Sequence, residues 1–182
     1  MPSPNWPLQT ARLTLRPFRP EDFEAFAGIH GDAEVARWLY NEPRRGKEAR
    51  ELFDRKRASS ALQAEGDWLG CAIVEEATGL VVGDLSFHWE SEEHRTGEIG
   101  FLLAPAAQGK GYATEAAGAL LNWAFAAGFH RVIGRLEARN VASARVLEKL
   151  GMRREALFVE NEWVKGEWQS ELVYAMLDRE WR

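Results

Sequence analysis

The segment with the clearest chemical meaning is a glycine-rich stretch at residues 108–113, Gln-Gly-Lys-Gly-Tyr-Ala, which follows an apolar run at residues 99–103. An apolar strand that ends in such a turn and then opens into a helix can bind phosphate oxygens. The glycines let the backbone close around an anion, and the helix N-terminus supplies free N–H groups and the positive end of a dipole. The segment therefore indicates a site for a phosphate-bearing ligand.

Two common phosphate-binding motifs do not fit this turn. A P-loop aligned on Gly109 and Lys110 requires a glycine where Ala104 stands and a serine or threonine where Gly111 stands. The dinucleotide pattern G-x-G-x-x-G fails because Thr114 occupies its third glycine position. These mismatches disfavour a nucleotide-dependent enzyme. They leave open that the two glycines only permit a tight connection between a strand and a helix.

A second segment lies about thirty residues further along the chain. It reads Asn-Val-Ala-Ser at residues 140–143, followed by Val-Leu-Glu-Lys-Leu-Gly-Met at residues 146–152. Asn140 stands where a helix N-cap is expected, and its side chain can cap the backbone N–H of Ala142 or Ser143. By itself this segment predicts a short capped helix that Gly151 ends.

In this order and at this separation, the two segments resemble the acetyl-coenzyme A site of the GNAT superfamily of N-acetyltransferases. Residues 108–113 match the superfamily's Q/R-x-x-G-x-G/A signature. The resemblance implies acetyl-CoA as co-substrate and no metal: the turn binds the pyrophosphate, and Asn140 and Ser143 contact the pantetheine arm. The implied coenzyme-binding residues are Phe101, Leu102, Leu103, Gln108, Gly109, Lys110, Gly111, Tyr112, Ala113, Thr114, Asn140 and Ser143.

Acetyl transfer to an amine requires that the ammonium form first lose a proton, so a base is needed. We assign this role to Glu98, which lies four residues before Leu102 on the same face of the strand. Glu98 also resembles the glutamate that acts as the catalytic base in histone-acetylating members of the superfamily. Glu98 can equally be an ordinary strand carboxylate in a cross-strand pair. Glu137 is the second choice, and His88 and His94 have suitable intrinsic pKa values. Oxyanion donors are expected from a splayed strand at residues 101–103.

One position departs from the family pattern. Leu147 stands where many relatives carry a tyrosine that reprotonates the departing thiolate. No general acid is therefore assigned, and CoA can leave as a thiolate, since a thiol has a pKa near ~8.5. The departure also keeps open a CoA-binding sensor without turnover.

Residues 13–18 with 20–22, and the tail at residues 165–176, look like the branch that includes ribosomal-protein alanine and serine N-acetyltransferases. That branch also contains enzymes for small amines and antibiotics. The predicted function is transfer of acetyl to a primary amine by direct attack, with a protein N-terminus and a small molecule as alternative acceptors. A protein acceptor needs an open groove between residues 20–65 and the terminal hairpin, whereas a small amine needs a closed pocket containing a carboxylate.

Composition places the chain among ordinary globular proteins: 182 residues, 46% hydrophobic and 28% charged. The net charge of -5 argues against nucleic acid as a partner. No run approaches the ~20 apolar residues of a membrane helix. The lone Cys71 fits a cytoplasmic location, and its apolar strand argues against an acyl-carrying role. We expect a single domain over residues 1–182, as a monomer or homodimer.

The elements that must position these residues follow from hydrophobic periodicity. Strands are predicted at residues 12–17, 68–75, 80–89, 96–103, 131–138, 155–163 and 168–177. Helices are predicted from residue 20 to Gly31, after Asp32, within residues 44–65, and at residues 112–127 and 142–150. The dense charges of residues 44–65 indicate a solvated surface. This order predicts a mixed α/β fold with a largely antiparallel central sheet, helices on both faces, and a splayed parallel strand pair.

Overall fold

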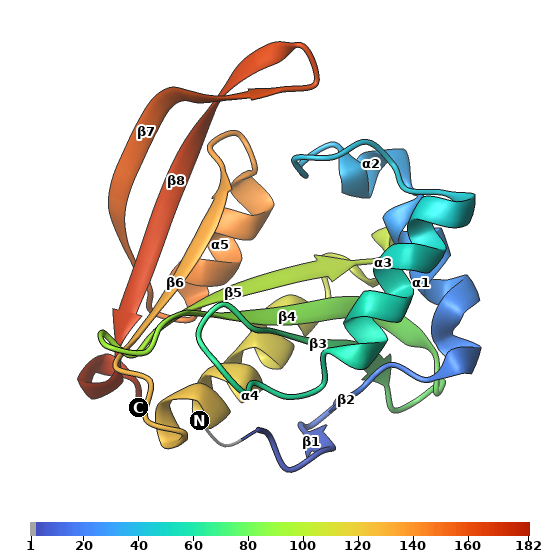
Figure 1. The fold of residues 1–182 in the computed structure, drawn as a ribbon, viewed down its shortest axis with the longest axis horizontal. Coiled ribbons are helices and arrows are strands. Elements are labelled where there is room, and N and C mark those ends of the chain that lie inside the picture. The colour runs from blue at the N-terminus through green and yellow to red at the C-terminus, as the bar shows by residue number, and fades with distance from the viewer. Residues whose placement is uncertain (1–2) are drawn as a thin grey trace.

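The protein folds around one eight-stranded sheet, described here from a computed structural model that covers residues 3–182 (Figure 1). The strand order is β1-β2-β3-β4-β5-β6-β8-β7, and every neighbouring pair is antiparallel except β5 and β6. The strands are β1 (Leu8–Gln9), β2 (Leu13–Arg16), β3 (Trp68–Glu75), β4 (Val81–Ser91), β5 (Thr96–Leu103), β6 (Arg131–Glu137), β7 (Arg153–Val164) and β8 (Glu167–Leu177). The predicted mixed α/β class with a largely antiparallel sheet is confirmed.

Helices cover both faces of the sheet, as predicted. On β3 the side chains of Cys71 and Ala72 point to opposite faces: Cys71 packs with residues of α4 and α5, and Ala72 packs with Phe26 of α1 and Phe53 of α3. The helices are α1 (Phe23–His30), α2 (Ala33–Ala36), α3 (Gly46–Ala58), α4 (Tyr112–Ala126) and α5 (Val141–Lys149), with short 3-10 turns at Pro20–Asp22, Pro105–Ala107 and Asp178–Glu180.

Two residues predicted to begin or end a helix, Asp32 and Gly128, do so in the structure. Asp32 begins α2, since its carboxylate accepts hydrogen bonds from the backbone N–H groups of Glu34 and Val35. Gly128 follows α4 with a φ of 95°, a left-handed conformation that favours glycine at a helix end. The helix predicted within residues 44–65 is shorter, ending at Ala58, and buried Leu62 lies beyond it.

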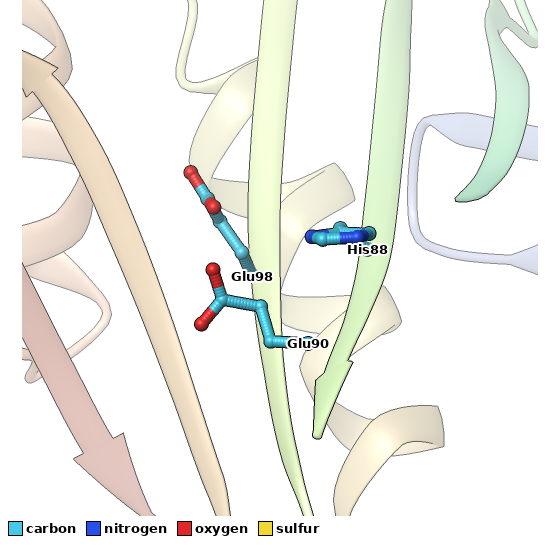
Figure 2. A group of neighbouring side chains, drawn as sticks. All are labelled: His88, Glu90 and Glu98. Atoms are coloured by element: carbon cyan, nitrogen blue, oxygen red, sulfur yellow. The ribbon is translucent and has the colours of Figure 1, made fainter. Parts of the chain in front are cut away.

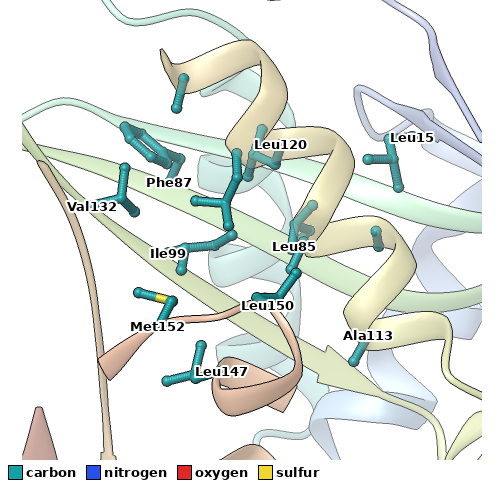
Figure 3. Close-up of a cluster of buried hydrophobic side chains, with 14 of the residues drawn as sticks. Leu15, Leu85, Phe87, Ile99, Ala113, Leu120, Val132, Leu147, Leu150 and Met152 are labelled. Atoms are coloured by element: carbon teal, nitrogen blue, oxygen red, sulfur yellow. The ribbon is translucent and has the colours of Figure 1, made fainter. Parts of the chain in front are cut away.

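The larger hydrophobic core lies between the sheet and the pair α4 and α5 (Figure 3). Fully buried side chains of α4, such as Leu120 and Leu121, pack onto Leu85 and Phe87 of β4. From α5, Leu147 contributes to the same cluster. Because this core fastens both helices to the central strands, it fixes where their N-termini lie relative to β5 and β6.

The only parallel contact among the described residues is short. β5 pairs with β6 through Thr96 and Arg131, Gly97 and Val132, and Glu98 and Ile133, and pairing then stops. Beyond these pairs the two strands diverge (Figure 1). The predicted splay is therefore present and begins directly after Glu98. In the same described part of the chain, no helix has the length and apolar character needed to span a membrane.

The packing of Gly97 leads to the first prediction. A Cβ at this position would lie 2.2 Å from Cζ of Phe87, so Gly97→Ala must displace that buried ring. We expect the free energy of unfolding to fall by about 1–3 kcal/mol, as for other overpacked cores. Urea denaturation followed by circular dichroism measures it. Gly28→Ala is the control, because Gly28 is exposed in α1 with no atom within 4 Å of an added Cβ, and it should stabilise by up to about 1 kcal/mol. Equal losses in both variants would contradict the prediction.

Candidate active site

A cavity of about 600 Å³ occupies the fork between β5 and β6. One end is lined by the glycine-rich turn, the first residues of α4, and α5. The other end is lined by the segment around α2, by Lys56 of α3, and by Asp84 and Ser86 of β4. Strand β5 runs between them, contributing residues 99–103 to the wall. The divergence of the strands therefore creates one continuous space with two chemically different ends.

The glycine-rich turn has the backbone conformation that its sequence requires. Gly109 and Gly111 have φ values of 76° and 83°, in the left-handed region that favours glycine. The side-chain amide of Gln108 donates to the carbonyl oxygen of Leu103 at 3.2 Å, which ties the turn to the end of β5. The first-turn N–H groups of α4, like those of any helix, have no intrahelical acceptor. Gly111, the N-cap, has no side chain that could accept from them. The turn can thus bind an anion through its backbone.

A second polypeptide segment braces this turn from outside. Arg12 donates through Nη1 to the carbonyl oxygen of Lys110 at 3.0 Å, and through Nε to Glu115 at 2.8 Å. Thr10 donates to the same carboxylate at 2.6 Å. These bonds lower the pKa of Glu115 against the opposing effect of its burial. The connection between β1 and β2 therefore holds the beginning of α4.

On α5, the cap predicted for Asn140 is present. Its Oδ1 accepts a hydrogen bond from the backbone N–H of Ser143 at 3.1 Å, and both residues line the cavity. This bond uses the amide oxygen, so the Nδ2 donors of Asn140 remain for a ligand carbonyl. Two cations to which neither motif assigns a role, Arg145 and Lys149, also lie in the wall and add positive charge at this end.

The predicted coenzyme residues are brought together by the fold, with one exception. The cavity wall contains every one of them except Lys110, whose exposed side chain lies outside the wall and whose carbonyl holds Arg12. Leu147, in the position of the missing tyrosine, is 1% exposed and also lines the cavity. Their contacts with the coenzyme itself stay a prediction.

Glu98 lies at the base of the fork, next to the cavity wall. Its carboxylate contacts the Arg135 guanidinium, which lines the cavity and also lies 2.6 Å from Glu90. Burial raises the pKa of Glu98 to about 7; Arg135 opposes this shift and Glu90 adds to it. A carboxyl group with this pKa is half ionised near neutral pH, as a general base requires.

The other candidate groups are either bonded to a neighbouring cation, stacked on an aromatic ring, exposed in a turn or buried in the core. Glu137 is 4% exposed and lines the cavity, but its carboxylate accepts two hydrogen bonds from Arg139. His94 is exposed in the turn before β5, and the His88 ring stacks on Trp68 with centroids 4.3 Å apart. Cys71 is buried in the core on the α4 face, and burial raises the pKa of its thiol, which excludes it as an acyl carrier.

His88, Glu90 and Glu98 form the one group in residues 3–182 that could offer three ligands to a metal ion, all within 4.8 Å of one another (Figure 2). Figure 2 shows the two carboxyl groups side by side. Arg135 already bonds both of them, and its fixed positive charge repels a cation at that point. The cluster therefore fits a hydrogen-bonded ion-pair network better than a metal site.

The side chains at the far end of the cavity were not singled out in the sequence, although they lie where an open groove for a protein acceptor was expected, between residues 20–65 and the terminal hairpin. Trp38, Leu39 and Tyr40 follow α2 and line this end together with Lys56. Tyr40 donates to Glu171 of β8 at 2.9 Å, and Lys165 of the β7–β8 turn bonds the carbonyl oxygen of Ala36. Lys56 corrects the expectation that the charges of residues 44–65 form only a solvated surface. No spacing signal identifies it, because it is one cation among many on α3.

Comparisons with known proteins agree with this architecture. A family model described as an acetyltransferase (GNAT) domain matches residues 12–153. The N-acetyltransferase YnaD of Bacillus subtilis (strain 168) is 30% identical over 175 residues, which are 96% of this chain and 98% of that protein. A GNAT acetyltransferase structure from Bacillus anthracis has a TM-score of 0.86 and 30% identity, covering 95% of this chain and 99% of that chain.

A spermidine N-acetyltransferase from Vibrio cholerae, solved in complex with CoA and spermine, has the same fold. Its TM-score is 0.79 at 20% identity, covering 94% of this chain and 98% of that chain. The fold and the comparisons together define an acetyl-CoA-dependent acyltransferase. This chain belongs to the GNAT family of N-acetyltransferases, as its sequence motifs predicted.

The left-handed turn supplies a direct test of the coenzyme end. Gly111→Ala places a Cβ at a φ of 83°, where a side chain costs about 1–2 kcal/mol, and narrows the approach of an anion. We expect the KM for acetyl-CoA to rise about tenfold or more, with a smaller effect on kcat. Gly79→Ala is the matched control, since it imposes comparable strain (φ 69°) in the β3–β4 turn, outside the cavity. A KM that is unchanged in Gly111→Ala would remove this turn from the coenzyme site.

Proposed function

We propose that this GNAT enzyme transfers the acetyl group of acetyl-CoA directly to a primary amine, with Glu98 as the general base. The observation that carries the proposal is the position of Glu98 in the last residue pair before β5 and β6 separate, with a pKa raised to about 7. Its carboxylate takes the proton from the acceptor's ammonium, through one water molecule where it does not reach directly.

The remaining steps need few side chains. The free amine attacks the thioester carbonyl, and backbone N–H groups of β5, at residues 101–103 where pairing with β6 has ended, can stabilise the oxyanion. When the tetrahedral intermediate collapses, the carbon–sulfur bond breaks and CoA leaves as a thiolate. Leu147 has no proton to give, so we assign protonation of the thiolate to water, which a thiol pKa near ~8.5 permits. The attacking nitrogen, positively charged in the tetrahedral intermediate, releases its second proton to water, which balances this protonation.

For the acceptor, the bonds that bridge the far end of the cavity favour a small amine over a broad protein groove. Tyr40 with Glu171, and Lys165 with Ala36, connect the α2 segment to the terminal hairpin across the space where an open groove would lie. A protein N-terminus remains the alternative, because the first residue of a flexible chain can enter a narrow opening.

The first experiment follows acetyl-CoA turnover as release of free thiol against a panel of small amines and N-terminal peptides. Turnover with small amines supports the proposed acceptor class. Turnover restricted to Ala- or Ser-starting peptides selects N-terminal acetylation. Tight acetyl-CoA binding by calorimetry without turnover on any amine would overturn catalysis and favour a CoA-binding sensor.

Replacing the proposed base predicts a specific change in pH dependence. In the wild type, kcat/KM for the amine should decline as the pH falls through about 7, because Glu98 becomes protonated and can no longer accept a proton. Glu98→Gln should lower kcat/KM by about 10²- to 10⁴-fold and abolish this acidic limb. Initial rates between pH 5.5 and 9 are the measurement.

Glu93→Gln provides the control, because Glu93 is exposed in the turn before β5. It should leave both the rate and the pH profile unchanged. If Glu98→Gln kept the acidic limb at the same pH, the titrating base would be another residue.

A further inference from the structure

The far end of the cavity contains a buried ion pair to which the proposed reaction assigns no role. The ammonium of Lys56 lies 2.8 Å from Oδ1 and 2.7 Å from Oδ2 of Asp84, and His30 Nε2 lies 2.8 Å from the same carboxylate. Asp84 is 2% exposed, whereas the Lys56 side chain is 21% exposed and lines the cavity together with Asp84. The three residues come from β4, α3 and α1, so the fold assembles this group from distant segments.

This arrangement holds Lys56 in one place. Both carboxylate oxygens of Asp84 contact the ammonium, and the additional contact with His30 fixes the carboxylate in turn. A lysine side chain is otherwise flexible, and its ordering carries an entropic cost. A buried ion pair is in general weak evidence for stability, since desolvation offsets its attraction. The pair therefore produces a fixed donor in the cavity wall rather than an evident gain in stability.

The ammonium retains capacity for a ligand. Lys56 Nζ has three N–H donors and no acceptor, and the two oxygens of Asp84 account for two of them. Because the pair carries no net charge, the remaining donor can hydrogen-bond a neutral oxygen as well as a carboxylate. A bare polyamine in its ammonium form offers only N–H donors, so it has no acceptor for the remaining donor of Lys56.

The position of the pair connects it to the reaction. Asp84 lies opposite Leu102 in the β4–β5 register, so both side chains are on the sheet face that α1 and α3 cover. Glu98 is on the same face of β5, four residues earlier. The coenzyme turn lies at the other end of the cavity. Lys56 and Asp84 therefore line the cavity on the same sheet face as Glu98, which lies four residues back along β5 and next to the cavity wall.

We propose that Lys56, held by Asp84, binds the acceptor by donating a hydrogen bond to an oxygen adjacent to the reactive amine. The acceptor is then an amine with a neighbouring carbonyl, carboxylate or hydroxyl group, as in amino-acid amides, amino sugars and peptide N-termini, and not a plain alkylamine or polyamine. This inference rests on the proposed function, because it assigns the recognition of the acceptor in the same site.

The test compares alaninamide with 2-aminobutane, which has a similar carbon skeleton without the carbonyl, as acceptors for the wild type and Lys56→Met. The ratio of their two kcat/KM values should favour alaninamide in the wild type and fall about tenfold or more in Lys56→Met. Comparing this ratio between proteins cancels the different basicities of the two amines. The KM for acetyl-CoA should not change, which separates acceptor recognition from a general loss of structure.

Two further variants keep the test decisive. Lys47→Met changes an exposed lysine on the same helix and should leave the ratio unchanged. Lys56→Arg retains a cationic donor and should preserve most of the preference, which covers the case in which Lys56→Met does not fold. An amino sugar, an Ala-starting peptide and spermidine extend the panel, and the first two distinguish a small acceptor from a peptide.

The outcomes separate the two proposals. Equal ratios in the wild type and Lys56→Met, or a preference of the wild type for spermidine, would overturn the role of Lys56 while acetyl transfer to amines stands. Absence of thiol release with every amine would overturn the proposed function and this inference with it.

Discussion

The early end of pairing between β5 and β6 is the constraint on which the site depends. Three residue pairs join the strands, and the next residues of β5 have no partner strand on that side. The large core under α4 and α5 and the antiparallel partners β4 and β8 hold each strand independently, so the fork does not close. The cavity, the strand N–H groups without a partner strand and the N-terminus of α4 thus meet at one place. The position of the strands creates this site, and on β5 neither residue at the point of divergence, Glu98 or Ile99, is a glycine or proline.

The electrostatics of the fork follow from the same geometry. Glu98 is the last residue of β5 that pairs with β6, and Arg135 lies two residues beyond its partner on β6. The guanidinium therefore meets Glu98 across the opening strands, while Glu90 reaches it from β4. One cation shared between two carboxylates neutralises neither fully. Burial then dominates, and the pKa of Glu98 rises despite the adjacent guanidinium. The network can hold the carboxylate in position and still leave it able to accept a proton.

The sequence predicted the elements well where a local signal existed. The boundaries of β3 and β5 and the start of α4 follow from apolar runs and glycine turns within one segment, and the coenzyme end was predicted because its residues are contiguous in two motifs. The two-residue strand β1 is too short to show any periodicity. The far end was missed because Lys56, Asp84 and His30 are separated by 26 or more residues and have ordinary surroundings in the sequence. Only the packing of α1 on β4, and of α3 on α1 and β3, brings them together.

The leucine in place of the expected tyrosine is best understood through packing. A Cβ on Gly134 of β6 would lie 2.8 Å from Cδ1 of Leu147, so the helix approaches the strand closely at this point. The Leu147 side chain fills this space between α5 and β6 and at the same time lines the cavity. Leu147 therefore stabilises the wall that holds the coenzyme end, at the cost of a proton donor. In the proposed mechanism a thiolate leaves readily near neutral pH, so that cost is small, and the reaction depends on the step that deprotonates the amine beside Glu98.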